Sequence, residues 1–153
     1  MAADAPGLKT RFKGGPSESP GLLLWRTTMR WQRAMTAALA PLDLTHVQFV
    51  LLASAMWLGR NGAPPNQVQL AAQAGTEAKM TSDVVARLAA KGLIAREGDP
   101  RDSRAKVIRI TPAGAAAAQQ AIIAVEAADA AFFGQVDQPQ LVNLLRQLAG
   151  EIR

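Results

Sequence analysis

Two arginines, Arg101 and Arg104, lie in a short segment that is rich in turn-forming residues and also holds Asp102. A guanidinium group carries a permanent charge, and on a narrow projecting element it can enter the minor groove of DNA, where the negative potential is strongest. Asp102 can hold a neighbouring guanidinium in one orientation through a charge-assisted hydrogen bond. The segment therefore predicts contact with a nucleic acid, and a solvated turn is the alternative.

This segment lies between two runs that suit β-strands, residues 93–97 and 106–110. The residues that join the runs include glycine, aspartate, proline and serine, which are typical of turns. We expect a projecting hairpin, a wing over residues 93–110, with the two arginines at its tip and Lys106 on its return strand. In the second run, Ile108 separates Val107 from Arg109, and this alternation predicts that one face of the strand packs and the other is wet.

A helical pattern over residues 76–91 comes directly before the hairpin and supplies a second set of polar side chains. A helical projection places Met80 and Val84 on one face, which predicts that this face packs in the core. Asp83 has two open interpretations: it accepts a hydrogen bond from a cytosine amino group, or it is a solvated charge paired with Arg87. The residues expected to face outward and to read bases from the N-terminal part of this recognition helix are Lys79, Thr81, Ser82 and Asp83.

Two capping patterns predict the helices that precede the recognition helix. Thr45 and Gln48 fit a capping box just before an apolar run, so a largely buried helix starts there. Asn66 can cap a short helix, which together with the 76–91 helix forms a helix-turn-helix. A winged helix-turn-helix lobe is therefore expected over residues 45–111.

Apolar periodicity predicts further helices on both sides of this lobe, over residues 20–40 and 112–153. The alanine-rich stretch after Pro112 and the apolar stripe from Leu141 to Ile152 offer more apolar surface than a small winged lobe can cover. We expect these helices to bury that surface in a homodimer, and a purely intramolecular bundle is the alternative. The expected fold is mainly α with a small β-hairpin (α+β), in one domain over residues 20–153.

The composition agrees with a polyanionic partner and excludes several other functions. The 153 residues carry a formal net charge of +5, and residues 66–111 contribute +3, from eight Lys or Arg against five Asp or Glu. There is no cysteine, which excludes disulfides, thiolate metal sites and cysteine redox sensing. Residues 1–19 are basic and rich in proline and glycine, so we expect a flexible arm that either contacts DNA phosphates or is a plain unstructured tail.

Neither catalysis nor a membrane location is predicted. The sequence has one histidine, no cysteine, no tyrosine, no glycine-rich phosphate loop and no obvious carboxylate pair, so it offers no catalytic constellation. No cofactor or metal is expected, because His46 has no histidine or cysteine partner. We expect a soluble, cytoplasmic protein, since there is no uncharged apolar run of about 18 residues and no signal-peptide core.

One set of aromatic and basic residues would suit a small aromatic or phenolic effector that carries negative charge. Its members are Trp25, Arg26, Trp31, His46 and Trp57. The alternative is that these residues pack in the core or at its boundary, as such residues commonly do.

Five short motifs occur along the chain: Leu44-Thr45, Gln48-Phe49, Gly92-Leu93-Ile94-Ala95-Arg96, Asp102-Ser103-Arg104 and Ile110-Thr111-Pro112-Ala113-Gly114. Together they resemble the multiple antibiotic resistance regulator (MarR) family of winged-helix repressors. The resemblance implies a triangular homodimer in which the first, fifth and sixth helices intertwine, with one winged lobe per subunit. It also implies binding to inverted-repeat operators. It implies release of DNA when a small ligand, an oxidant or a metal binds, although the family's oxidant sensors depend on cysteine. It also implies that Arg104 enters the minor groove and that Asp102 anchors it.

The function expected from the sequence is therefore that of a sequence-specific DNA-binding transcriptional regulator, a repressor by the resemblance. A winged-helix interaction module that dimerises without reading DNA is the alternative. A neutral wing would favour that alternative. The wing instead carries the basic residues Arg101, Arg104 and Lys106, which argue against it.

Overall fold

A computed structural model describes residue 7 and residues 9–151, in two units divided between Arg33 and Ala34. The first unit holds a 3-10 turn, Pro16–Glu18, and most of helix α1 (Pro20–Leu39). Its exposed apolar side chains include Leu23, Leu24 and Trp25. Residues 1–6 and 8 of the expected arm, and Ile152 of the expected apolar stripe, lie outside the described residues. The division into arm, winged lobe and dimerisation helices stays a prediction.

The second unit contains the end of α1, five further helices and one antiparallel hairpin. These elements are α2 (His46–Leu58), α3 (Gln67–Ala74), α4 (Ala78–Ala90), β1 (Ile94–Asp99), β2 (Asp102–Ile110), α5 (Pro112–Phe133) and α6 (Gln138–Ala149). The expected fold class, mainly α with a small β-hairpin, is confirmed.

Local sequence sets the start of α2 and of α3. In the predicted capping box, the backbone N–H of Gln48 donates to Thr45 Oγ1 and that of Thr45 donates to Gln48 Oε1, both at 3.2 Å. Asn66 and Gln69 make a second reciprocal pair with both distances at 2.9 Å. Each box satisfies N–H groups that the first turn of a helix leaves without a partner. Both predicted helix starts are confirmed.

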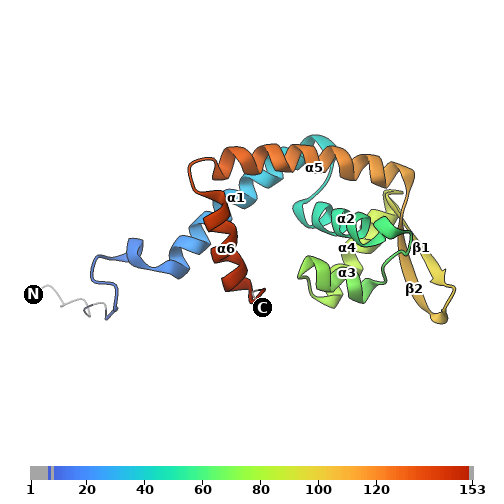
Figure 1. Ribbon diagram of the computed structural model, residues 1–153, viewed down its shortest axis with the longest axis horizontal. Coiled ribbons are helices and arrows are strands. Elements are labelled where there is room, and N and C mark those ends of the chain that lie inside the picture. The colour runs from blue at the N-terminus through green and yellow to red at the C-terminus, as the bar shows by residue number, and fades with distance from the viewer. Residues whose placement is uncertain (1–6, 8, 152–153) are drawn as a thin grey trace, which may run out of the picture. The chain divides into compact units, whose positions relative to one another are not determined.

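Helix α2 is the centre of the second unit. It contacts α3, α4, α5 and β2, and Figure 1 shows α5 and α3 on opposite sides of it. Leu51 and Leu52 of α2 are fully buried, as are Leu70 of α3 and Leu88 of α4. Burying one such side chain stabilises the fold by about 1.5–3 kcal/mol. This apolar core therefore fixes α3 and α4 on α2.

The hairpin is packed on both faces near its base. Its register runs from the Ile94–Ile110 pair to the Asp99–Asp102 pair, with an irregularity between Gly98 and Asp99. Val107 and Ile108 are both buried, so the predicted alternation of a packed and a wet face is wrong in this part of β2. The segment before α3 explains the difference, because Asn66 bridges to Val107 and Pro65 O accepts a hydrogen bond from the Ile108 N–H (2.8 Å).

Helix α5 begins directly against the base of the hairpin. A Cβ built on Gly114 would lie 1.8 Å from the carbonyl oxygen of Leu93, so only glycine permits this approach. The helix ends at Phe133, and α6 follows after a short turn (Figure 1).

Among the described helices, none is long and apolar enough by itself to cross a membrane. The bent pair of segments 20–42 and 46–61 passes the same test together by length and composition, a weak signal that buried core helices also give.

Candidate nucleic-acid interface

The hairpin tip holds Arg101, in the turn, through the carboxylate of Asp99, the last residue of β1. Its Nε and Nη2 atoms lie 3.2 and 3.3 Å from the two carboxylate oxygens of Asp99, and its backbone N–H donates to the same carboxylate (2.9 Å). The side-chain hydrogen bond from Arg101, followed by the backbone hydrogen bond, lowers the pKa of Asp99. Asp99 therefore stays ionised and neutralises part of the charge of Arg101.

Arg104 is held differently and keeps its guanidinium exposed. Asp102 Oδ1 accepts a hydrogen bond from the backbone N–H of Arg104 (2.9 Å), a turn-type contact across two residues. Within the described part of the chain, the ion pairs and hydrogen bonds include none from the Arg104 guanidinium. The expected guanidinium anchor on Asp102 is therefore corrected: Asp102 orders the backbone, and at the tip it is Asp99 that holds an arginine side chain.

Lys106 and Arg109 complete the basic side chains of β2. Lys106 pairs in register with Gly98 and is exposed. The Nε atom of Arg109 donates to Glu97 Oε2 at 2.8 Å, so its charge is compensated across the hairpin. Lys106 is therefore the better candidate for an anionic partner.

The recognition helix α4 presents a different face from the one predicted. Thr81 is 0% exposed, and its Oγ1 donates to the carbonyl oxygen of Glu77 (2.9 Å) and lies 2.8 Å from Thr76 Oγ1. The prediction that Thr81 reads bases is therefore wrong. Met80, which was expected in the core, is 50% exposed. The buried face is Thr81, Val84, Val85 and Leu88, an i, i+3, i+4, i+7 pattern that is rotated from the one predicted.

The other predicted side chains of α4 are accessible. Lys79, Asp83 and Arg87 are exposed and Ser82 is half-buried. The ion pairs among the described residues do not join Asp83 to Arg87, so the interpretation of Asp83 as a paired charge gains no support. A contact from Asp83 to a cytosine stays a prediction.

The residues proposed for an aromatic effector do not form one site. His46 and Trp57 lie 57 − 46 = 11 residues apart on α2, which is roughly 16 Å at the rise of an α-helix. Trp57 is exposed and stacks on Arg60, whose Cζ lies 3.8 Å from the ring centroid. The prediction that both residues line a single small pocket is therefore wrong. Trp25, Arg26 and Trp31 lie in the first unit.

His46 lines a cavity of about 450 Å³ at the start of α2. The other lining residues are Thr36, Ala40, Asp43, Leu44, Thr45 and Lys91. Burial lowers the pKa of His46, and the charge of Asp129 opposes that change. Neutral histidine is therefore favoured here. Among the described residues, no group of three or more His, Asp or Glu is arranged to hold a metal ion.

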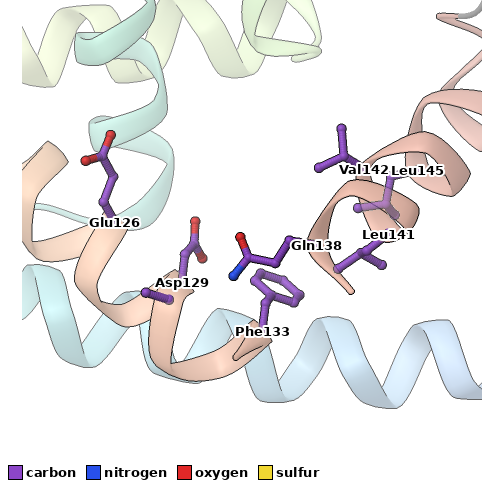
Figure 2. A pocket seen from close by; sticks show the side chains of 8 residues that line it. Glu126, Asp129, Phe133, Gln138, Leu141, Val142 and Leu145 are labelled. Atoms are coloured by element: carbon purple, nitrogen blue, oxygen red, sulfur yellow. The ribbon is translucent and has the colours of Figure 1, made fainter. Parts of the chain in front are cut away.

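A second cavity, of about 360 Å³, lies between the end of α5 and α6 (Figure 2). Glu126 and Asp129 of α5 lie on one side of it, across from Leu141, Val142 and Leu145 of α6. None of the residues of α6 is buried, and its apolar side chains Leu144, Leu145 and Leu148 are exposed. The apolar face of α6 is therefore uncovered within this unit.

A helix-turn-helix followed by a hairpin with exposed arginines defines a winged helix-turn-helix DNA-binding protein. The MarR family model matches residues 44–106. The chain is 44% identical over 119 residues to the uncharacterized HTH-type transcriptional regulator YdcH of Bacillus subtilis (strain 168), covering 78% of this chain and 81% of that protein. It is 31% identical over 100 residues to the multiple antibiotic resistance protein MarR of Salmonella typhimurium, covering 65% and 67% of the two chains. The chain therefore belongs to the MarR family of transcriptional regulators, which confirms the resemblance.

Solved structures of similar proteins include forms with ligands and DNA. BpsR of Bordetella bronchiseptica, whose DNA binding is regulated by 6-hydroxynicotinic acid, matches with a TM-score of 0.79 at 26% identity, over 87% of this chain and 94% of BpsR. CouR of Rhodococcus jostii RHA1 bound to p-coumaroyl-CoA matches with a TM-score of 0.76 at 28% identity, over 87% and 90% of the chains. CouR bound to a 23-mer DNA duplex has a TM-score of 0.76 at 25% identity, over 94% and 100%.

Proposed function

We propose that the protein is a transcriptional repressor that binds an inverted-repeat operator as a homodimer. The observation that carries the proposal is the hairpin tip, where Arg104 is exposed near the start of β2 with no carboxylate on its guanidinium among the described residues. An uncompensated arginine on a thin element suits a narrow minor groove. The DNA-bound CouR structure supports the same partner for a protein of this fold.

The exposed face of α4 supplies the second contact with DNA. Lys79 and Ser82 lie in the N-terminal part of this helix, from which recognition helices reach base edges. Asp83 and Arg87 follow on the accessible side, where Arg87 reaches a phosphate and Asp83 accepts from a cytosine. In the wing, Lys106 contacts a phosphate. Arg101 also contacts only a phosphate and does not enter the minor groove, because Asp99 already neutralises part of its charge.

The homodimer is supported by apolar surface that one copy leaves uncovered. The apolar side chains of α6 and the cavity between α5 and α6 form a face that the second structural unit does not bury by itself. Exposed apolar faces of this kind usually mark an interface with another chain. A twofold dimer places two winged lobes on half-sites about 10 base pairs apart from centre to centre.

Release by a small aromatic effector is the regulatory part of the proposal. Lys91 also lines the cavity at His46, so a carboxylate or phenolate would find a cationic residue there. BpsR, whose DNA binding is regulated by 6-hydroxynicotinic acid, and CouR, which binds p-coumaroyl-CoA, support a ligand with a hydroxylated aromatic ring. We infer a cytoplasmic regulator that is not an enzyme, since the relatives are transcriptional regulators.

A selection experiment tests the proposal. Wild-type protein is used to enrich duplexes from a random-sequence pool, and its affinity for the enriched duplex and for a scrambled duplex is then measured by fluorescence anisotropy. We expect an inverted repeat, a preference of at least about 10³-fold, and an affinity that falls steeply with salt. Equal affinity for both duplexes would contradict the proposed function.

A further inference from the structure

The two DNA-reading parts share one joint, formed by residues 91–93 at the end of α4. Gly92, at a φ of 72°, turns the chain out of the helix, and the N–H of Leu93 donates back to the carbonyl oxygen of Leu88 (3.0 Å). Thr111 closes the base of the hairpin on this joint: its Oγ1 donates to Gly92 O (2.7 Å) and its N–H donates to Leu93 O (3.1 Å). A displacement of the joint therefore moves the recognition helix and the wing together.

Lys91 connects this joint to the start of α2. Its ammonium group donates to Gln48 Oε1 (3.2 Å) and to the carbonyl oxygen of Asp43, and it lies 3.3 Å from Asp43 Oδ2. A cation at the C-terminal end of α4 is also favoured by the dipole of that helix. One side chain thus links α4 to the turn before α2 and to the first turn of α2.

The acceptors that Lys91 uses are fixed by their own surroundings. Gln48 is 5% exposed, and its Oε1 also accepts the Thr45 N–H in the capping box. Asp43 has a left-handed backbone with a φ of 52°, and its N–H donates to the carbonyl oxygen of Ala40 (3.1 Å). The Asp43 carboxylate is exposed, so its ion pair contributes little. The charge-assisted hydrogen bonds to Gln48 and to the Asp43 carbonyl are the stronger contacts.

We propose that Lys91 is a positioning residue that holds the joint of the recognition helix and the wing against α2. It sets where the recognition helix and the wing, with Lys79 and Arg104, lie relative to α2, and so it matters for a specific operator more than for DNA in general. This inference rests on the proposed DNA-binding function. The competing role for Lys91 is a direct phosphate contact, which would add to the salt dependence of binding.

Full-length Lys91→Met, which keeps the apolar stem and removes the charge and the donors, separates these roles. On the duplex enriched by the wild type, we expect an affinity loss of about tenfold. The affinity for scrambled duplex and the slope of log affinity against log salt stay at the wild-type values. The matched control is Lys106→Met, which removes a proposed phosphate contact. It is expected to weaken both duplexes and to reduce the salt slope by about 1.

Lys91→Arg, which keeps a cation and donors, is expected to recover most of the loss. An arginine variant as weak as the methionine variant would contradict a role through donated hydrogen bonds. Lys91→Met that binds like the wild type, or that lowers the salt slope by as much as Lys106→Met, would overturn the positioning role. If the wild type itself does not distinguish the two duplexes, the proposed function fails, and this is a separate result from the failure of Lys91 alone.

Discussion

The recognition helix and the wing tip are positioned by opposite kinds of interaction. Helix α4 is held by burial, because Thr81, Val84, Val85 and Leu88 pack into the core. The tip is held by local hydrogen bonds across two residues, from Arg101 to Asp99 and from Arg104 to Asp102. A helix that depends on packing ties DNA reading to the stability of the lobe, whereas a locally ordered tip does not. Substitutions in the two parts should therefore affect different measurements.

The largest expected effect is on the stability of the lobe. Leu88→Ala should lower the free energy of unfolding by about 2–5 kcal/mol, because it leaves a cavity beneath the recognition helix. Arg104→Ala at the exposed tip should change it by less than about 0.5 kcal/mol. Urea denaturation followed by circular dichroism measures both. Equal destabilisation by the two variants would mean that the tip is not independent of the core.

The second effect concerns operator binding. Arg104→Ala should cost about 1–3 kcal/mol of binding free energy, since it removes the arginine proposed for the minor groove. Anisotropy titration measures the affinity, and sedimentation should show an unchanged dimer. Arg101→Ala is the matched control at the same tip, and a smaller loss is expected because Asp99 already compensates that arginine. A larger loss for Arg101→Ala would reverse the roles given to the two arginines.

Two neighbouring hydroxyl groups sharpen the comparison within α4 itself. Thr81→Val should cost about 0.5–1.5 kcal/mol of stability, because it removes the buried hydrogen bond to Glu77 O, and it should leave operator affinity unchanged. Ser82→Ala should weaken operator binding and leave the stability unchanged. Thermal unfolding and anisotropy on the same samples give both quantities. Weaker operator binding by Thr81→Val without a loss of stability would contradict the inward orientation.

The smallest effect is the pH dependence of the Arg101–Asp99 contact. The pKa of Asp99 is lowered in the folded chain, so this contact stabilises the tip above the ordinary aspartate range and is lost as the pH falls through the folded value. Asp99→Asn should mimic the protonated state at neutral pH by freeing Arg101, and should slightly raise the affinity for scrambled duplex. Reduced affinity for scrambled duplex would show that Asp99 does more than neutralise charge.

The same contrast explains what the sequence could predict. The helix starts at Thr45 and Asn66 and the hairpin position follow from neighbouring residues, and these expectations were confirmed. The buried face of α4 was missed because threonine counts as polar in a helical projection, although its hydroxyl can bond to the preceding turn. The spacing of Thr81 from Val84, Val85 and Leu88 was the available signal.

Other errors came from contacts that sequence spacing does not reveal. Asp99 and Asp102 each precede an arginine by two residues, so spacing alone could not show which carboxylate holds a guanidinium. The burial of both faces of β2 depends on a bridge from Asn66, which lies far from the hairpin in the sequence. The separation of His46 from Trp57 is different, because the sequence already carried the signal: the two residues lie 57 − 46 = 11 positions apart in one helix.

A footprint of the enriched duplex tests most directly whether the wing and α4 read different grooves. Hydroxyl-radical cleavage reports protection in the minor groove, and dimethyl sulfate reports protection of guanine N7 in the major groove. With Arg104→Ala at saturating concentration, we predict that minor-groove protection beside each half-site disappears and that guanine protection remains. Footprints identical to those of the wild type in both reactions would contradict the account, because Arg104 would then not lie in the minor groove.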